Sequence, residues 1–159
     1  MRILWKLSIL LLFVAHVAQA QPEGAPAVPI RAMLDHSALP AGGEARLAFV
    51  FEVPDRHHLT DTTYGLFFVT VTDTLELHFS KPEFPKGVKY KDEIAYRGNV
   101  AVYSTVTANA DAEPGLRSFP VTVGYQVCQE FGAEVCFLPE EEQVTLEIEV
   151  VPAGTSAAK

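Results

Sequence analysis

The stretch "EARLAFVFEV", residues 44–53, indicates the fold class because its apolar side chains recur with a period of two. Ala45, Leu47, Phe49, Phe51 and Val53 occupy alternate positions. Successive side chains of a β-strand point to opposite faces of a sheet, so these five residues would share one face. We therefore predict a strand that buries this face in a core.

The same alternation returns along most of the chain, between short stretches rich in Pro, Gly and Asp. It recurs in "GLFFVTVTD" (65–73), "LELHFS" (75–80), "NVAVYSTVTA" (99–108), "RSFPVTVGYQVC" (117–128) and "VTLEIEV" (144–150). No stretch with helical periodicity follows the first 20 residues. Short strands at regular spacing are typical of a sandwich of two sheets. The sequence thus predicts an all-β sandwich.

The first 20 residues, "MRILWKLSILLLFVAHVAQA", have the parts of a secretory signal peptide. Two basic residues precede an apolar run, and Ala18-Gln19-Ala20 gives the small-x-small cleavage pattern. We expect cleavage after Ala20 and a protein that is periplasmic or otherwise exported. An uncleaved membrane anchor is the alternative, although the apolar run is short for a full span. Residues 21–29 are expected to be a flexible leader and residues 152–159 a disordered tail.

The charge balance argues against nucleic acid as a partner. The chain has a net charge of −8, and loss of the signal peptide removes Arg2 and Lys6 and no acidic residue, which gives −10. Nucleic-acid phosphates require basic residues, and so do anionic lipid surfaces. The sequence also has no Gly-rich phosphate loop and no nucleophile motif around Ser104, and we expect no cofactor.

Cys128 and Cys136 are the only cysteines, and they lie in "VCQEFGAEVCFLPEEE", residues 127–142. Cys128 ends one predicted strand, and Cys136 begins the run that leads into the next. The pair fits a structural disulfide, a metal clamp or a pair that exchanges electrons. A structural disulfide here would close a ring of nine residues and contribute about 2.5 kcal/mol. A bridge within one loop does not join two sheets, so an exchanging pair stays open beside the structural disulfide.

Residues 123–150, "VGYQVCQEFGAEVCFLPEEEQVTLEIEV", resemble the end of the N-terminal periplasmic domain of the DsbD-type transmembrane thiol:disulfide interchange proteins. The family has a Tyr-Gln-x-Cys segment, a short loop, and a second Cys followed by an aromatic, a Pro and a Glu. The matching residues are Tyr125, Gln126, Cys128, Cys136, Phe137, Pro139 and Glu140. "EFPKGVKYKDEIAYRGNVAVY" (83–103) and "VPDRHHLTD" (53–61) resemble other segments of the same domain. The resemblance covers most of residues 30–151.

This resemblance implies an immunoglobulin-like β-sandwich over residues 30–151, with a cysteine pair that passes reducing equivalents. Its partners would be thioredoxin-like or transmembrane disulfide reductases and exported proteins that contain disulfides. Because the chain ends at residue 159, we expect its electron donor to be a separate protein. The activity implied is that of a protein-disulfide reductase or thiol:disulfide interchange protein.

The resemblance also implies supporting residues around Cys128 and Cys136. In the family an Asp-Glu pair lies beside the cysteines, and a capping aromatic shields them until a partner docks. Asp92 and Glu93 match the acidic pair, and Tyr125 belongs to the matched cysteine segment. Ile94 stands where the capping aromatic is expected, and the segment from Glu93 to Tyr96 is short. The cap would then be reduced, or supplied by Tyr90 or Tyr96. The loop between the cysteines is also longer than usual.

Acidic residues crowd the cysteine segment: Glu130, Glu134, Glu140, Glu141 and Glu142. Nearby negative charge disfavours a thiolate, so we expect slow attack at neutral pH until a partner docks. Cys136 follows a flexible loop and is expected at the rim, where a partner sulfur reaches it.

Two other interpretations remain. The neighbouring His57 and His58 would bind copper or zinc with the cysteines only if both pointed the same way, but adjacent strand residues point to opposite faces. We therefore predict no metal site. The second alternative is a non-catalytic immunoglobulin-like binding module in which Cys128 and Cys136 form a structural disulfide.

Overall fold

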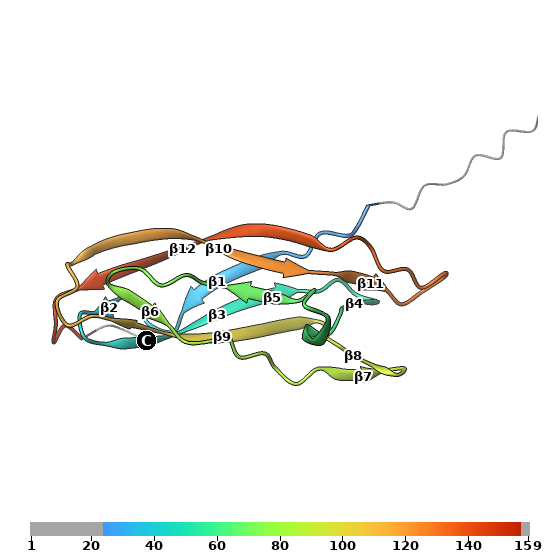
Figure 1. Cartoon of the computed structure of the whole chain (residues 1–159), viewed down its shortest axis with the longest axis horizontal. Helices are drawn as coiled ribbons and strands as arrows, with labels where there is room; N and C mark the ends of the chain where they lie inside the picture. Colours follow the sequence, from blue (N-terminus) through green and yellow to red (C-terminus); the bar gives the residue numbers. More distant parts are fainter. Residues whose placement is uncertain (1–23, 157–159) are drawn as a thin grey trace, which may run out of the picture.

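The structure is a computed structural model that describes residues 24–156. Two four-stranded sheets form the two layers of the body (Figure 1). The first sheet has the order β1 (Ile30–Leu34), β3 (Glu44–Glu52), β9 (Asn99–Ala108), β6 (Leu77–Phe79). The second has the order β2 (Leu39–Pro40), β12 (Glu140–Val151), β10 (Gly115–Tyr125), β5 (Phe68–Thr70). The predicted all-β sandwich is confirmed, and the expected signal peptide lies outside the described residues.

Two of the predicted strands match the observed ones closely, whereas the strand predicted at 117–128 is divided at Gln126 into β10 and β11. β9 has the predicted bounds, and β3 ends one residue earlier than predicted. The strands predicted at 65–73 and 75–80 are shorter, because a turn at Asp73 and Thr74 separates β5 from β6. The Asp73 carboxylate accepts a hydrogen bond from the Phe79 N–H at 2.8 Å, and the Thr74 hydroxyl accepts one from the Leu77 N–H at 2.9 Å.

The core lies between the two sheets and consists of the inward-facing residues of the alternating strands. The predicted face of β3 is buried throughout. Its Phe51 ring packs edge-on against Phe67, with ring centroids 5.1 Å apart. β9, β10 and β12 contribute Val102, Val106, Val121, Val123, Leu146 and Ile148, which are all buried. Val28, within the expected leader, is 4% exposed and packs into this core.

Two short ribbons extend the sandwich at one end, toward the right in Figure 1. β10 ends at Tyr125, and the chain continues after Gln126 as β11 (Val127–Gln129), which pairs with β4 (His57–Leu59). β7 (Val88–Tyr90) and β8 (Glu93–Ala95) form a hairpin that stands off the body. A short 3₁₀ helix (Thr62–Tyr64) follows β4. The β4–β11 ribbon and this hairpin position the cysteines.

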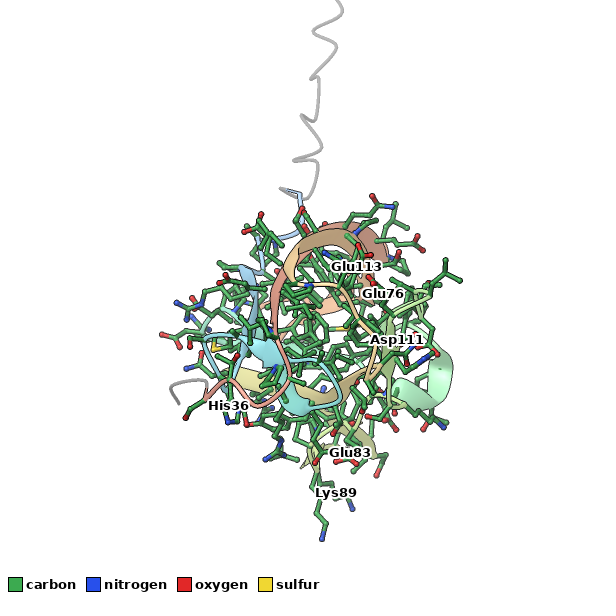
Figure 2. The ribbon with its side chains drawn as sticks, turned by 90° about the vertical axis from the view of Figure 1, so that its left-hand side faces the viewer. His36, Glu76, Glu83, Lys89, Asp111 and Glu113 are labelled. Atoms are coloured by element: carbon green, nitrogen blue, oxygen red, sulfur yellow. A yellow bond between two sulfur atoms is a disulfide. The ribbon has the colours of Figure 1, made fainter. Side chains whose placement is uncertain are left out.

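The opposite end of the molecule carries loops rich in acidic residues. Figure 2 shows this end with the side chains of Glu76, Asp111 and Glu113 near one another. Glu76 accepts hydrogen bonds from the Arg117 guanidinium, at 2.8 Å for Nη2, and from the Glu113 N–H at 3.0 Å. The same figure shows Lys89 of β7 pointing away from the body.

Candidate functional site

Cys128 and Cys136 form a disulfide between two extended segments that lie side by side. Cys128 is the middle residue of β11, and an antiparallel bridge places Cys136 directly opposite it, with their Cα atoms 3.9 Å apart. The residues on either side exchange backbone hydrogen bonds of 2.9 Å, from Gln129 to Val135 and from Phe137 to Val127. This is a non-hydrogen-bonded antiparallel pair, in which facing side chains approach most closely. The backbone register therefore holds the two sulfur atoms together.

The loop between the cysteines reverses direction through two residues in the left-handed region. Gly132 has a φ of 62° and Glu134 a φ of 49°. The Glu130 N–H donates to the Arg56 carbonyl at 2.8 Å, which ties the start of the loop to the segment before β4. The tight turn at Gly132 brings Cys136 back beside Cys128.

The two cysteines differ in their exposure. Cys128 is 2% exposed, whereas Cys136 is an exposed residue. β11 alternates as predicted: Val127 joins the core, and Cys128 points to the other face. Exposed apolar side chains surround Cys136, among them Val135 and Leu138, which is 85% exposed. An incoming sulfur atom therefore meets Cys136 first.

A pocket of about 310 Å³ lies in front of the disulfide. Its walls come from β4, from β11 with the loop that follows, and from the tip of the β7–β8 hairpin. Both cysteines line it, together with Tyr90, Asp92 and Glu93. The hairpin tip therefore forms one wall of a pocket that both cysteines line.

Side-chain contacts join the hairpin tip to the loop between the cysteines. Lys91, in the left-handed region with a φ of 54°, forms an ion pair with Glu134. The Tyr90 hydroxyl donates to the other oxygen of the same carboxylate at 3.4 Å. This contact raises the pKa of Lys91 and lowers the pKa of Glu134, in each case chiefly through the hydrogen bond between the two side chains. All three residues are at least partly exposed, so the contact is open to solvent.

A second set of contacts lies deeper in the pocket, around His58. His58 Nδ1 lies 2.9 Å from Glu130 Oε1, and the Arg97 Nε donates to the same oxygen at 2.6 Å. The Tyr90 ring packs against both His58 and Arg97. Its centroid lies 4.8 Å from the His58 ring centroid and 4.6 Å from the Arg97 guanidinium carbon. Burial lowers the pKa of His58, and this outweighs the opposing effect of its hydrogen bond to Glu130.

Two of the five glutamates expected around the cysteines are paired with nearby cations. Glu130 pairs with Arg97, and Glu134 pairs with Lys91. Glu140 and Glu142 instead accept hydrogen bonds from the Tyr125 hydroxyl, at 3.2 and 2.8 Å, outside the cysteine pocket. Asp92 and Glu93 line the pocket without an ion pair among the described residues. They are therefore its main source of uncompensated negative charge.

A comparison with protein families matches residues 27–148 to the model of "Thiol:disulfide interchange protein DsbD, N-terminal". The chain belongs to this family. Membership implies thiol:disulfide interchange, and the disulfide between Cys128 and Cys136 lies inside the matched region. A search of curated proteins finds no significant match to the chain.

The structure brings together some of the residues carried over from the DsbD N-terminal family and separates others. Asp92 and Glu93 lie at the pocket with both cysteines. Ile94 is 40% exposed and contacts Gly87, so that a Cβ at Gly87 would come within 2.3 Å of its side chain. Tyr96 is buried against Phe67. These two residues do not line the pocket.

Tyr125, the remaining residue carried over from the DsbD N-terminal family, also lies in the core. Its ring packs edge-on against Phe51, with centroids 6.3 Å apart. Burial, helped by Glu142 and Glu140, raises the pKa of its hydroxyl. Tyr125 therefore supports the end of β10, and Tyr90 is the aromatic residue that lies at the cysteine pocket.

Sequence analysis missed the part played by His58, Lys91 and Arg97. His58 was considered only as a metal ligand beside His57, although alternation with the buried Leu59 would have placed it on the face of β4 away from the core. Lys91 pairs with Glu134, 43 residues away in the sequence, and Arg97 pairs with Glu130, 33 residues away. Contacts at that separation leave no local pattern.

Two further features of the described residues bear on function. Within residues 24–156, no group of three or more His, Cys, Asp or Glu side chains is placed to share a metal ion. In the same range there is no helix long and apolar enough to cross a membrane.

Proposed function

We propose that this domain exchanges thiols and disulfides with exported proteins through Cys128 and Cys136. It would accept reducing equivalents from a thioredoxin-like or transmembrane reductase and pass them to disulfide-containing partners in the periplasm. The unequal exposure of the two sulfur-bearing residues carries this proposal, because exchange needs one accessible sulfur and one protected partner. Family membership supports it.

The exchange runs through a mixed disulfide. A donor thiolate attacks Cys136 Sγ, the bond to Cys128 Sγ breaks, and Cys128 leaves as a thiolate that takes up a proton. A second thiolate of the donor then attacks the donor sulfur in the mixed disulfide and releases Cys136. Two electrons have passed to the domain, and the donor holds the new disulfide. The same steps in reverse, begun by Cys136, reduce a client disulfide.

The fold also argues against a purely structural disulfide. The ring closed by the bond contains nine residues, and the bond contributes about 2.5 kcal/mol at most on the chain-entropy model. Cys128 lies on the face of β11 away from the core, and neither cysteine belongs to the cluster of packed apolar residues between the sheets. The core therefore forms without this bond.

Single-cysteine variants test the proposal. The probe is a thioredoxin-like protein with only its attacking cysteine, activated as a mixed disulfide with thionitrobenzoate. Cys128→Ser should displace thionitrobenzoate rapidly through the exposed Cys136 and form a stable cross-link, seen by mass spectrometry. Cys136→Ser should cross-link much more slowly, roughly tenfold or more, because Cys128 is buried.

The double variant, with Cys128→Ser and Cys136→Ser, sets the background. Faster cross-linking through Cys128 than through Cys136 would contradict the assigned point of attack and leave exchange itself in place. No cross-linking by either single variant would favour a binding module with a structural disulfide.

A further inference from the structure

His58 faces Cys128 across the β4–β11 ribbon. The two residues are Cα partners in the antiparallel register, and their neighbours Leu59 and Val127 form the next pair. Leu59 and Val127 belong to the core, so His58 and Cys128 share the opposite face. Side chains directly opposite on such a ribbon have Cβ atoms about 4.5–5.5 Å apart. Both residues are buried, and both line the pocket in front of the disulfide.

The orientation of the His58 ring is fixed from its other side. Nδ1 faces the Glu130 carboxylate at 2.9 Å. A carboxylate accepts hydrogen bonds, so the proton of the neutral ring lies on Nδ1 and the lone pair on Nε2. Glu130 is held in turn by Arg97 and by its own N–H on the Arg56 carbonyl. Among the described residues Nε2 makes no hydrogen bond, and it is not among the buried polar atoms that lack a partner, so it keeps some accessible surface. His58 is one of the residues that line the pocket.

We propose that His58 is the proton acceptor and donor for Cys128 and that Glu130 is a positioning residue for His58. This inference rests on the proposed exchange function. When the reduced domain resolves a mixed disulfide on Cys136, Nε2 takes the proton of the Cys128 thiol. The resulting thiolate attacks Cys136 Sγ and expels the partner's sulfur as a thiolate. In the reverse direction Cys128 leaves as a thiolate, and a proton from solvent reaches it through Nε2 of His58.

The charged groups around His58 suit this role. Glu130 contacts it from the loop after β11 and Tyr90 from β7. The charges of Glu93 on β8 and of Arg97 after β8 also act on it. Burial lowers the pKa of His58, whereas Glu130 and Glu93 raise it and Arg97 lowers it further. The ring is therefore neutral at pH 7, the form that accepts a proton. A carboxylate, an oriented imidazole and a nucleophile in series form the same sequence of roles as in a catalytic triad.

A purely structural histidine does not explain this arrangement. The hydrogen bond to Glu130 satisfies Nδ1, but Nε2 has no hydrogen-bond partner among the described residues, and His58 lines a pocket together with the buried Cys128. Cys128 is also the thiol that most needs a proton acceptor, because burial disfavours its thiolate. His58 supplies the missing acceptor.

A two-phase thiol assay tests the role of His58. The reduced domain is mixed with dithiobis(nitrobenzoate). In the first phase Cys136 attacks the reagent and releases one thionitrobenzoate. In the second phase Cys128 attacks the mixed disulfide on Cys136 and releases another. His58→Gln should slow the second phase roughly tenfold or more at pH 7. It should leave the first phase unchanged. The pH midpoint of the second phase should rise toward the ordinary pKa of a cysteine thiol that has no base beside it, about 8.5.

His57→Gln is the matched control, because His57 points away from Cys128 and packs against Phe131. It should change neither phase. Glu130→Gln keeps the His58 imidazole but removes the negative charge that raises its pKa. The second phase should therefore slow, and its pH midpoint should move to lower pH. This second variant also carries the test if His58→Gln does not fold.

Three results would overturn the role of His58. They are an unchanged second phase in His58→Gln, an equal loss in His57→Gln, and an unchanged midpoint in Glu130→Gln. Absence of a second phase in the unsubstituted domain would overturn the proposed exchange function, and the role of His58 with it.

Discussion

Cys128 and Cys136 sit in different electrostatic surroundings although they are bonded to each other. Cys128 is enclosed by the β4–β11 ribbon, whereas Cys136 faces solvent among apolar side chains. Of the acidic residues near them, Glu130 and Glu134 are paired with cations. The carboxylates of Asp92 and Glu93 line the same pocket without such partners. In the reduced domain these two charges oppose formation of a thiolate.

Replacing Asp92 with Asn and Glu93 with Gln should therefore make the reduced pair more reactive. We expect the alkylation rate at pH 7 to rise a few-fold, because removal of like charge favours the thiolate. The rate of iodoacetamide modification against pH measures this. Asp111→Asn with Glu113→Gln removes the same charge at the far end of the molecule (Figure 2) and serves as the control. Equal rates in the two double variants would show that Asp92 and Glu93 do not act on the cysteines.

We propose that the β7–β8 hairpin partly covers the disulfide, because its tip forms one wall of the pocket in front of the bond and side chains tie it to the loop between the cysteines. It forms a two-stranded sheet of its own, joined to β4 by a backbone bridge between Tyr96 and Leu59. Toward its tip the contacts are those of Tyr90 and Lys91 with Glu134. Exposed contacts of this kind are weak and screened by salt. The tip is therefore the part of the cover that opens most easily.

Lys91→Met should loosen this cover. We expect the disulfide to be reduced by a small thiol roughly two to five times faster, the effect of losing one exposed ion pair. Lys89→Met removes a lysine from the same hairpin that points away from the body, and it should have no effect. Because contact with Lys91 lowers the pKa of Glu134, the ion pair is complete above the ordinary Glu value of 4.5 and is lost as pH falls below it. The difference between the two variants should therefore vanish in acid. A difference in reduction rate between the two variants that persists in acid would show that the ion pair between Lys91 and Glu134 does not hold the hairpin tip.

Elements of different length were predictable to different degrees. β3 and β9 bury a whole face over nine or more residues, so period-two alternation identifies them. β12 alternates only from Val144, because its first four residues are all exposed, so alternation identifies only its second part. β4, β7 and β8 have three residues each, which is too short for a period to show. The resemblance to the DsbD family located the cysteine pair and the acidic pair. It did not indicate His58 or Lys91, whose roles depend on tertiary contacts with Glu130 and Glu134.

The residues that stabilise the fold and the cysteines proposed to carry out exchange lie in different parts of the molecule. The core between the sheets carries the large apolar side chains, and the redox pair lies outside it at one end. A domain of this size has a net stability of about 5–15 kcal/mol, and a nine-residue disulfide ring accounts for about 2.5 kcal/mol of it. We therefore expect the disulfide to open and close while the sandwich stays folded, as the proposed exchange requires.

Equilibrium reduction with simultaneous measurement of folding tests this central claim most directly. The domain is brought to equilibrium with a thioredoxin-like protein in buffers of graded redox potential. Thiol alkylation measures the reduced fraction, and circular dichroism with urea measures the free energy of unfolding. We predict that both thiols become alkylatable in the folded state, with the free energy of unfolding lower by about 2.5 kcal/mol. A disulfide that resists reduction until the domain unfolds, or a domain that unfolds when the bond opens, would contradict the account.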